Sequence, residues 1–239
     1  MKFSDWTVGV VVPARDEEDH IGECLASIRA SLENGSGIRS SWIVVVADSC
    51  RDRTAACARA ALGNTGEVIE CEVRSPGTAR RMGVDALLRR YPTAGLSQVW
   101  IANTDADSLP APNWIHRQLS FAAQAYAGVA GVVHVSSIDG LGTDDVTALL
   151  EHYVVNEDGS HPHVHGANLG IRGDAYVDAG GWSDLPVAED HCLWSRVKAR
   201  NWPTISSAAS VVVTSGRLVG RATGGFADNL RRRLELRYA

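Results

Sequence analysis

The chain has 239 residues, of which 45% are hydrophobic and 21% are charged, and its formal net charge is −5. A chain of this length and composition can bury a full hydrophobic core, so we expect one folded domain over residues 1–239 and exclude a disordered protein. Because the acidic balance leaves no broad basic face to neutralise phosphates, we expect no nucleic-acid partner.

The cysteines and the apolar runs indicate the compartment. The five cysteines lie far apart and form no CxxC pair, which is typical of reduced thiols in a cytosolic protein and does not support a zinc site. No stretch reaches about 18 uninterrupted apolar residues, and the first residues lead into a strand pattern without a signal-peptide layout. We therefore expect a cytoplasmic protein.

The first half of the chain alternates strand and helix patterns. Short apolar runs predict strands at 6–12, 42–47, 68–71 and 98–103, and Pro13 closes the first of them. Apolar residues at helical spacing predict helices at 21–32, 54–62 and 79–87. Such alternation is typical of right-handed βαβ crossovers, so we expect an α/β fold with a doubly wound, mostly parallel sheet.

The second half is more irregular. Its patterns predict, in chain order, a helix at 114–126, a strand at 129–135, a partly helical excursion at 136–166, a strand at 168–171, a helical turn at 174–179, a helix at 188–200, a strand at 211–214 and a basic helix at 227–238. The composition therefore divides near residue 105, with halves at about 7–107 and 108–220 and a basic C-terminal part at 221–239.

Two carboxylates follow the fourth predicted strand. Asp105 and Asp107 come directly after the apolar run, and Pro110 and Pro112 are expected to stop further strand pairing. Ligands of open α/β sheets bind at the carboxyl ends of the strands, where a pair of hard oxygen donors suits Mg²⁺ or Mn²⁺ held together with a substrate's phosphates. The alternative is a simple turn, with an Asp cap before the helix that starts near Asn113.

Six stretches together resemble the family 2 glycosyltransferases, which have the GT-A fold. They cover about residues 8–200 in the family's order: Val11-Val-Pro13-Ala-Arg15-Asp-Glu17, Val46-Ala-Asp48 with Asp52 and Thr54, Gly77-Thr-Ala-Arg80, Thr104-Asp105-Ala-Asp107, Gly166-Ala167-Asn168 with Trp182, and Glu189-Asp190. Two positions depart from the family pattern, because Ala47 replaces an acid and Arg81 replaces an Asn.

The resemblance implies transfer of a sugar, with inversion, from a UDP- or GDP-sugar to a small-molecule or lipid-linked hydroxyl acceptor. The implied donor site consists of Pro13, Arg15, Glu17, Asp48, Arg80 and Asp105, and Asp107 with Asp105 would hold Mn²⁺ or Mg²⁺. The implied acceptor site contains Gly166, Ala167, Asn168 and Trp182, and we expect His163, His165 and Arg217 beside it. Asp190 is the expected general base, with Glu189 beside it.

Simpler readings stay open for several of these residues. Asp48 could cap the next helix instead of binding a base, and Arg80 could lie on a solvated helix face. Acids at 189 and 190 are common in a first helical turn. His161, His163 and His165 could instead form a zinc site, although the pattern lacks the further His and Asp of a metallohydrolase.

The basic residues near the C-terminus also allow two readings. Arg217 could close over a diphosphate or an anionic acceptor group, or could lie in a solvated loop. The basic helix at 227–238 would suit peripheral contact with an anionic membrane surface.

Two other functions remain as alternatives. A nucleotidyltransferase shares a nucleotide-binding α/β half and an acidic metal site, but the Gly-poor loop at 13–17 disfavours it. A non-catalytic nucleotide-sugar-binding protein is the second alternative, and the presence of both Asp107 and Asp190 argues against it.

Overall fold

The computed structural model describes residues 5–92, 95–135, 153–185 and 187–217. Its helices and strands are, in chain order, β1 (Trp6–Ala14), α1 (Ile21–Glu33), β2 (Ile38–Asp48), α2 (Thr54–Leu62), β3 (Gly66–Cys71), α3 (Pro76–Arg90), η1 (Leu96–Gln98), β4 (Val99–Asn103), β5 (Ser108–Pro110), α4 (Trp114–Ala122), β6 (Gly128–Val135), η2 (Gly166–Asn168), β7 (Leu169–Arg172), α6 (Gly173–Asp178), α7 (Glu189–Ala199) and β8 (Thr204–Thr214).

One eight-stranded sheet, in the order β3-β2-β1-β4-β7-β6-β8-β5, runs through the domain. The pairs among β3, β2, β1 and β4 are parallel, as is the pair of β6 with β8. β7 is antiparallel to both of its neighbours, and β5 is antiparallel to β8. The expected mostly parallel sheet is thus confirmed, with two reversed strands in its second half.

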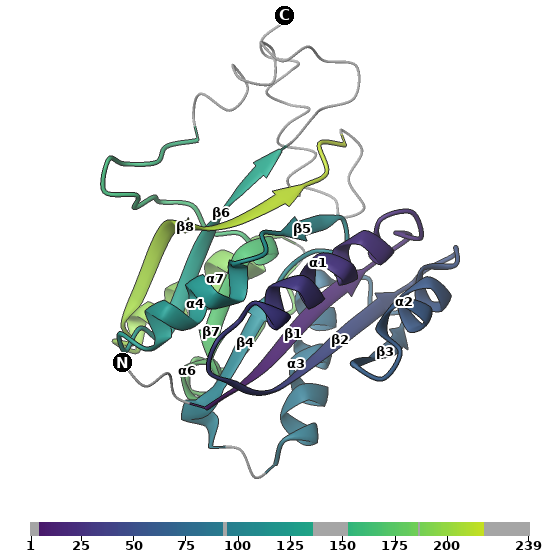
Figure 1. Cartoon of the computed structure of the whole chain (residues 1–239), viewed down its shortest axis with the longest axis horizontal. Coiled ribbons are helices and arrows are strands. Elements are labelled where there is room, and N and C mark those ends of the chain that lie inside the picture. Colours follow the sequence, from purple (N-terminus) through teal and green to yellow (C-terminus); the bar gives the residue numbers. More distant parts are fainter. Residues whose placement is uncertain (1–4, 93–94, 136–152, 186, 218–239) are drawn as a thin grey trace, which may run out of the picture.

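Helices cover both faces of the sheet (Figure 1). Val8, Val10 and Val12 of β1 pack on the side of α1, α2 and α4, whereas Val11 packs on the side of α3, α6 and α7. Successive side chains of a strand point to opposite faces, so a strand covered on both faces must be apolar at nearly every position. This is why the strands of the first half read as continuous apolar runs.

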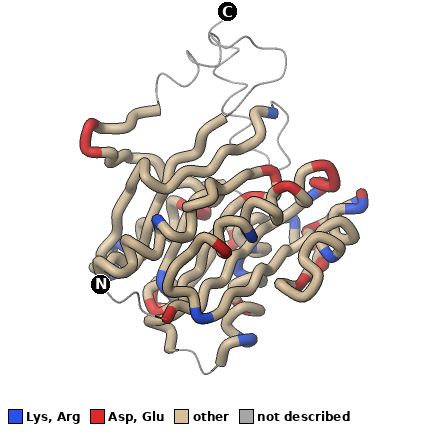
Figure 2. Tube along the Cα trace, in the orientation of Figure 1, with Lys and Arg blue, Asp and Glu red and all other residues tan. Residues whose placement is uncertain are grey.

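The acids of the first half gather where its parallel strands end. The loops that follow β1, β2 and β4 lie at one edge of the sheet because these strands run in the same direction. Figure 2 shows acidic segments along this edge, including the loop that follows β1. The fold therefore brings together the loops on which the sequence places its candidate donor residues.

The structure corrects one prediction about strand pairing. Pro110 was expected to stop pairing, yet Leu109 and Pro110 lie opposite Val213 and Val212 in the short strand β5. β5 is the last strand of the sheet, where proline is tolerated because its missing N–H can face away from the ladder. The strand fixes the segment that directly follows Asp107.

Some predictions lie outside the described residues. These are the basic C-terminal part at 221–239 and most of the excursion at 136–166, of which residues 153–166 are described. Within the described ranges, none of the helices combines the length and apolar character needed to span a membrane.

Candidate active site

Asp105 and Asp107 follow β4, and each carboxylate meets an arginine. An oxygen of Asp105 accepts a hydrogen bond from Arg80 Nη2 at 2.6 Å, and Asp107 Oδ2 lies 3.0 Å from Arg217 Nη2. Burial and the nearby charge of Asp105 raise the pKa of Asp107 to about 6, although Arg217 works in the opposite direction. Asp107 is thus a half-buried acid whose charge Arg217 balances.

Arg80 is a buried cation that connects two distant acids. Its guanidinium, on α3, donates to Asp105 and, at 2.5 Å, to Glu189, and it lies 5.1 Å from the ring centre of Trp182. Burial disfavours its charge, but Asp105 and Glu189 outweigh that effect and raise the pKa of Arg80. The side chain is only 4% exposed and pairs with two acids, so it does not lie on the solvated helix face considered above; its contact with a pyrophosphate stays a prediction.

Glu189 and Asp190 begin α7 and differ in their surroundings. Glu189 is buried and faces Arg80. Asp190 is half-buried, and its Oδ2 accepts the backbone N–H of Gly166 at 2.8 Å while its Oδ1 accepts that of His191. Asp190 therefore lies in the first turn of α7, where acids are common, but it is not the N-cap residue, which is Ala188, and it also reaches the segment before β7.

Glu17 and Arg217 form a pair that the sequence did not predict. Both nitrogens of the Arg217 fork meet both oxygens of Glu17, at 2.8 and 2.6 Å. Glu17 is 4% exposed and also contacts His20. Arg217 was assigned to the acceptor side, yet it lies on the acids of the donor side, because β8 ends beside the strand that follows Asp107.

Asp48 shapes the loop between β3 and α3. Its buried carboxylate accepts the backbone N–H groups of Val73, Arg74 and Ser75, at 2.9, 2.9 and 3.0 Å. It does not cap α2, which was the alternative to a base contact. Pro13 lies near the end of β1, and Arg15 follows that strand, half-buried.

Two residues expected on the acceptor side belong to the interior of the fold. The Asn168 amide donates to the carbonyls of Val132 and Ser210 and accepts from Trp114 and from the Ser210 hydroxyl, which uses its full hydrogen-bonding capacity. Trp182 is fully buried. Neither side chain is therefore exposed to an acceptor. Gly166 and Ala167 are also buried, and Gly166 packs closely on the Arg80 guanidinium.

The three histidines before η2 form a row with Tyr153. The rings of Tyr153 and His163 stack at 3.9 Å between centres, and His163 lies about evenly between His161 and His165, at 5.8 and 6.0 Å. Burial lowers the pKa of His165 to about 4, while Asp190 opposes the shift. Stacked rings do not converge on one point, so this row does not have the geometry of the zinc site considered above.

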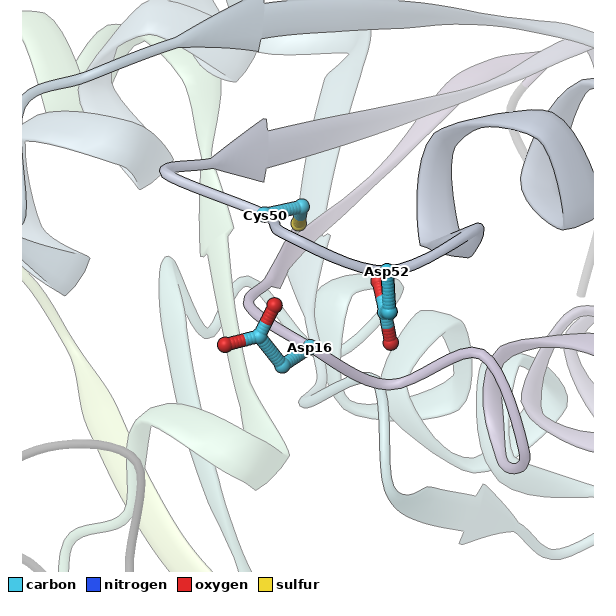
Figure 3. A group of neighbouring side chains, drawn as sticks. All are labelled: Asp16, Cys50 and Asp52. Carbon is cyan, nitrogen blue, oxygen red and sulfur yellow. The ribbon is translucent and has the colours of Figure 1, made fainter.

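In the described part of the chain, one group of three side chains does converge as cation ligands would. Asp16, Cys50 and Asp52, from the loops after β1 and β2, place one ligand atom each within 4.8 Å of the others (Figure 3). Asp16 also accepts the backbone N–H of Arg51, and Asp52 accepts that of Glu18. These bonds fasten the two loops to each other. The sequence offered only the general signal of acids after two neighbouring parallel strands.

The comparisons with known proteins agree with this geometry. The family model described as glycosyltransferase-like family 2 matches residues 6–233. The chain belongs to that family. This confirms the resemblance seen in the motifs, and the sheet with its covering helices has the GT-A fold. No curated protein sequence matches the chain.

Two solved structures illustrate the fold. The mannosyltransferase PcManGT from Pyrobaculum calidifontis, in complex with GDP-Man and Mn²⁺, is 21% identical with a TM-score of 0.61, over 86% of this chain and 56% of that one. S. aureus TarS 1-349, in complex with UDP-GlcNAc, is 15% identical with a TM-score of 0.65, over 96% of this chain and 65% of that one. The chain thus spans less than two thirds of either neighbour.

Proposed function

We propose that this chain transfers a sugar, with inversion, from a nucleotide-sugar donor to a hydroxyl acceptor, and that the transfer depends on a divalent cation. One observation carries the proposal. Arg80 holds Asp105, which follows β4, and Glu189, which begins α7, at 2.6 and 2.5 Å. The acids with the pattern of a cation site and the acids with the pattern of a general base therefore belong to one site.

The donor diphosphate would bind beside Asp105 and Asp107, with the nucleoside toward the loops after β1 and β2, where Pro13, Arg15, Glu17 and Asp48 lie. The residues fit a cation because the half-buried Asp107 already has a positive group, Arg217, against its carboxylate. Mn²⁺ or Mg²⁺ bound there would neutralise the charge that develops on the departing diphosphate.

Asp190 would act as the general base. Its carboxylate would take the proton of the acceptor hydroxyl as the oxygen attacks the anomeric carbon and the bond from that carbon to the diphosphate breaks. The products are a glycoside of inverted configuration, a nucleoside diphosphate and a protonated Asp190. The N–H of Gly166 would hold the Asp190 carboxylate in position. Glu189 would not react itself but would hold Arg80.

The acceptor would lie near Asp190, along the segment that contains His163, His165, Gly166 and Ala167. His165 suits this location as a neutral hydrogen-bonding group, because burial lowers its pKa to about 4. We propose an uncharged hydroxyl, on a small molecule or on a lipid carrier, as the group that attacks.

A nucleotide panel tests the donor site. UDP, GDP, UDP-GlcNAc and GDP-mannose, the last two chosen because the neighbours bind them, are added with Mn²⁺ or with EDTA, and the melting temperature is measured. We expect at least one nucleotide to stabilise the protein much more with Mn²⁺, because a diphosphate beside two carboxylates needs a bridging cation. Equal shifts with EDTA, or no shift with any nucleotide, would contradict the proposed donor site.

A further inference from the structure

Arg217 is placed as a cation within the acidic site. Its Nη2 lies between two carboxylates, 2.6 Å from Glu17 Oε1 and 3.0 Å from Asp107 Oδ2, and its Nη1 is 2.8 Å from Glu17 Oε2. Within the described residues, Arg217 and Arg80 both pair with acids of this site. The Asp107 contact is the weaker of its two attachments, because Glu17 meets both terminal nitrogens of the guanidinium, one through a hydrogen bond and the other through an ion-pair contact.

The backbone also keeps Arg217 next to Asp107. The N–H of Ser215 donates to the Asp107 carbonyl at 3.2 Å, and the hydroxyls of Ser108 and Thr214 are 2.9 Å apart. The end of β8 is therefore fastened to the residues that follow Asp107. A guanidinium held in this way occupies one oxygen of the carboxylate that the proposed cation would need.

We infer that Arg217 is an internal cation that competes with the divalent cation for Asp107. When the divalent cation binds, Arg217 gives up Asp107 and stays on Glu17, where its contacts through both terminal nitrogens keep it at the site. This inference rests on the proposed function, since it assumes that Asp107 is a cation ligand. Arg217 would then set the affinity of the site for the divalent cation. This role differs from the acceptor contact that the sequence suggested.

The test measures binding of Mn²⁺ alone, without nucleotide, from the electron paramagnetic resonance signal of the free ion. Arg217→Gln should bind Mn²⁺ more tightly than the wild type, by roughly tenfold, which is the size of one lost charge-assisted hydrogen bond. Adding Asp107→Asn to Arg217→Gln should remove this gain. Arg200→Gln is the control, because Arg200 pairs with Asp178 at the surface of α7 and should leave the affinity unchanged.

The outcomes separate the inference from the proposed function. Equal Mn²⁺ affinity in the wild type and Arg217→Gln would overturn the inference and leave the cation site standing. An absence of Mn²⁺ binding in both proteins would overturn the cation site and the inference with it. A gain that survives the Asp107→Asn substitution would also overturn the inference, because the ion would then bind elsewhere.

A measurement on the wild type avoids any effect of the substitution on folding. Arg217 is 23% exposed, and an arginine-selective dicarbonyl reagent followed by mass spectrometry reports its reactivity. Saturating Mn²⁺ should raise the modification of Arg217 severalfold, because the displaced fork loses one of its acceptors. Unchanged reactivity at saturating Mn²⁺ would contradict the inference.

Discussion

Arg80 shows how one side chain holds this site together. It comes from α3, and its two partners follow β4 and begin α7, so it ties together segments that are far apart in the sequence. A buried guanidinium with two acids is hard to replace, because removing it leaves the buried Glu189 without a compensating charge.

Arg80→Met should therefore destabilise the fold by about 3 kcal/mol, mainly through the unpaired Glu189. Urea unfolding measures the change. Arg81→Met, at an exposed position of the same helix, is the matched control and should have little effect. Adding Glu189→Gln to Arg80→Met should restore part of the loss; no recovery would mean that the cost comes from lost packing instead of an uncompensated charge.

His165 should make the stability depend on pH. Burial lowers its pKa from 6.5 to about 4, so between these values the unfolded chain binds a proton that the folded chain does not. The stabilisation is fully present above pH 6.5 and is lost as the pH falls toward 4, by at most on the order of 3 kcal/mol.

Unfolding at pH 7 and pH 5 checks this dependence. His165→Gln should lose less stability on acidification than the wild type, whereas His134→Gln, at an exposed position of β6, should behave like the wild type. The same loss in His165→Gln and in the wild type would show that other groups cause the acid sensitivity.

At the scale of elements, the sequence pattern predicted a helix correctly where neighbouring residues determine its ends. The expected helix at 54–62 has those bounds in the structure, because its start follows Asp52, whose carboxylate accepts the N–H of Thr54, and Gly63 follows its end. β5 was missed because its pairing with β8 depends on residues distant in the sequence, which no local rule for proline could reveal. The expected helix at 114–126 ends earlier, at Ala122.

The packing of α3 on β1 gives a prediction at this scale. A Cβ on Gly9 would overlap the side chain of Leu87, which is fully buried. Gly9→Ala should therefore cost about 1–3 kcal/mol, as overpacking of a close-packed core does. Gly22→Ala on α1 is the matched control, because a Cβ there meets nothing within 4 Å and a helical alanine is favoured.

Thermal or urea unfolding of both glycine variants gives the comparison. If Gly9→Ala were as stable as Gly22→Ala, the close approach of α3 to the centre of the sheet would be wrong.

At the scale of the whole molecule, the sequence predicted the fold class and the chemical character of the site but not all of its contacts. Motifs identify residue types in order, and six of them in order specified the family. The motifs do not show which charged side chains form ion pairs in the folded protein. Asn168 and Trp182 were expected at the acceptor and are buried, and Arg217 was expected there and lies against Glu17 and Asp107. Those contacts depend on where β7 and β8 enter the sheet.

In the proposed mechanism, Asp190 is a catalytic base and not only an acid in the first turn of α7. The measurement is the turnover of a bound nucleotide-sugar with Mn²⁺, as transfer or as slow donor hydrolysis, beside a melting curve for each variant. Asp190→Asn can still accept the N–H of Gly166 through its amide oxygen, so the fold and the nucleotide affinity should persist.

Turnover by Asp190→Asn should fall by about 10² to 10⁴-fold, the usual effect of removing a general base, because an amide cannot take the acceptor's proton. Glu189→Gln should reduce turnover less, since Glu189 acts through Arg80. If folded Asp190→Asn, with its nucleotide affinity intact, turns over acceptor at the wild-type rate, Asp190 is only an acid of the first helical turn and the proposed role as a base is contradicted.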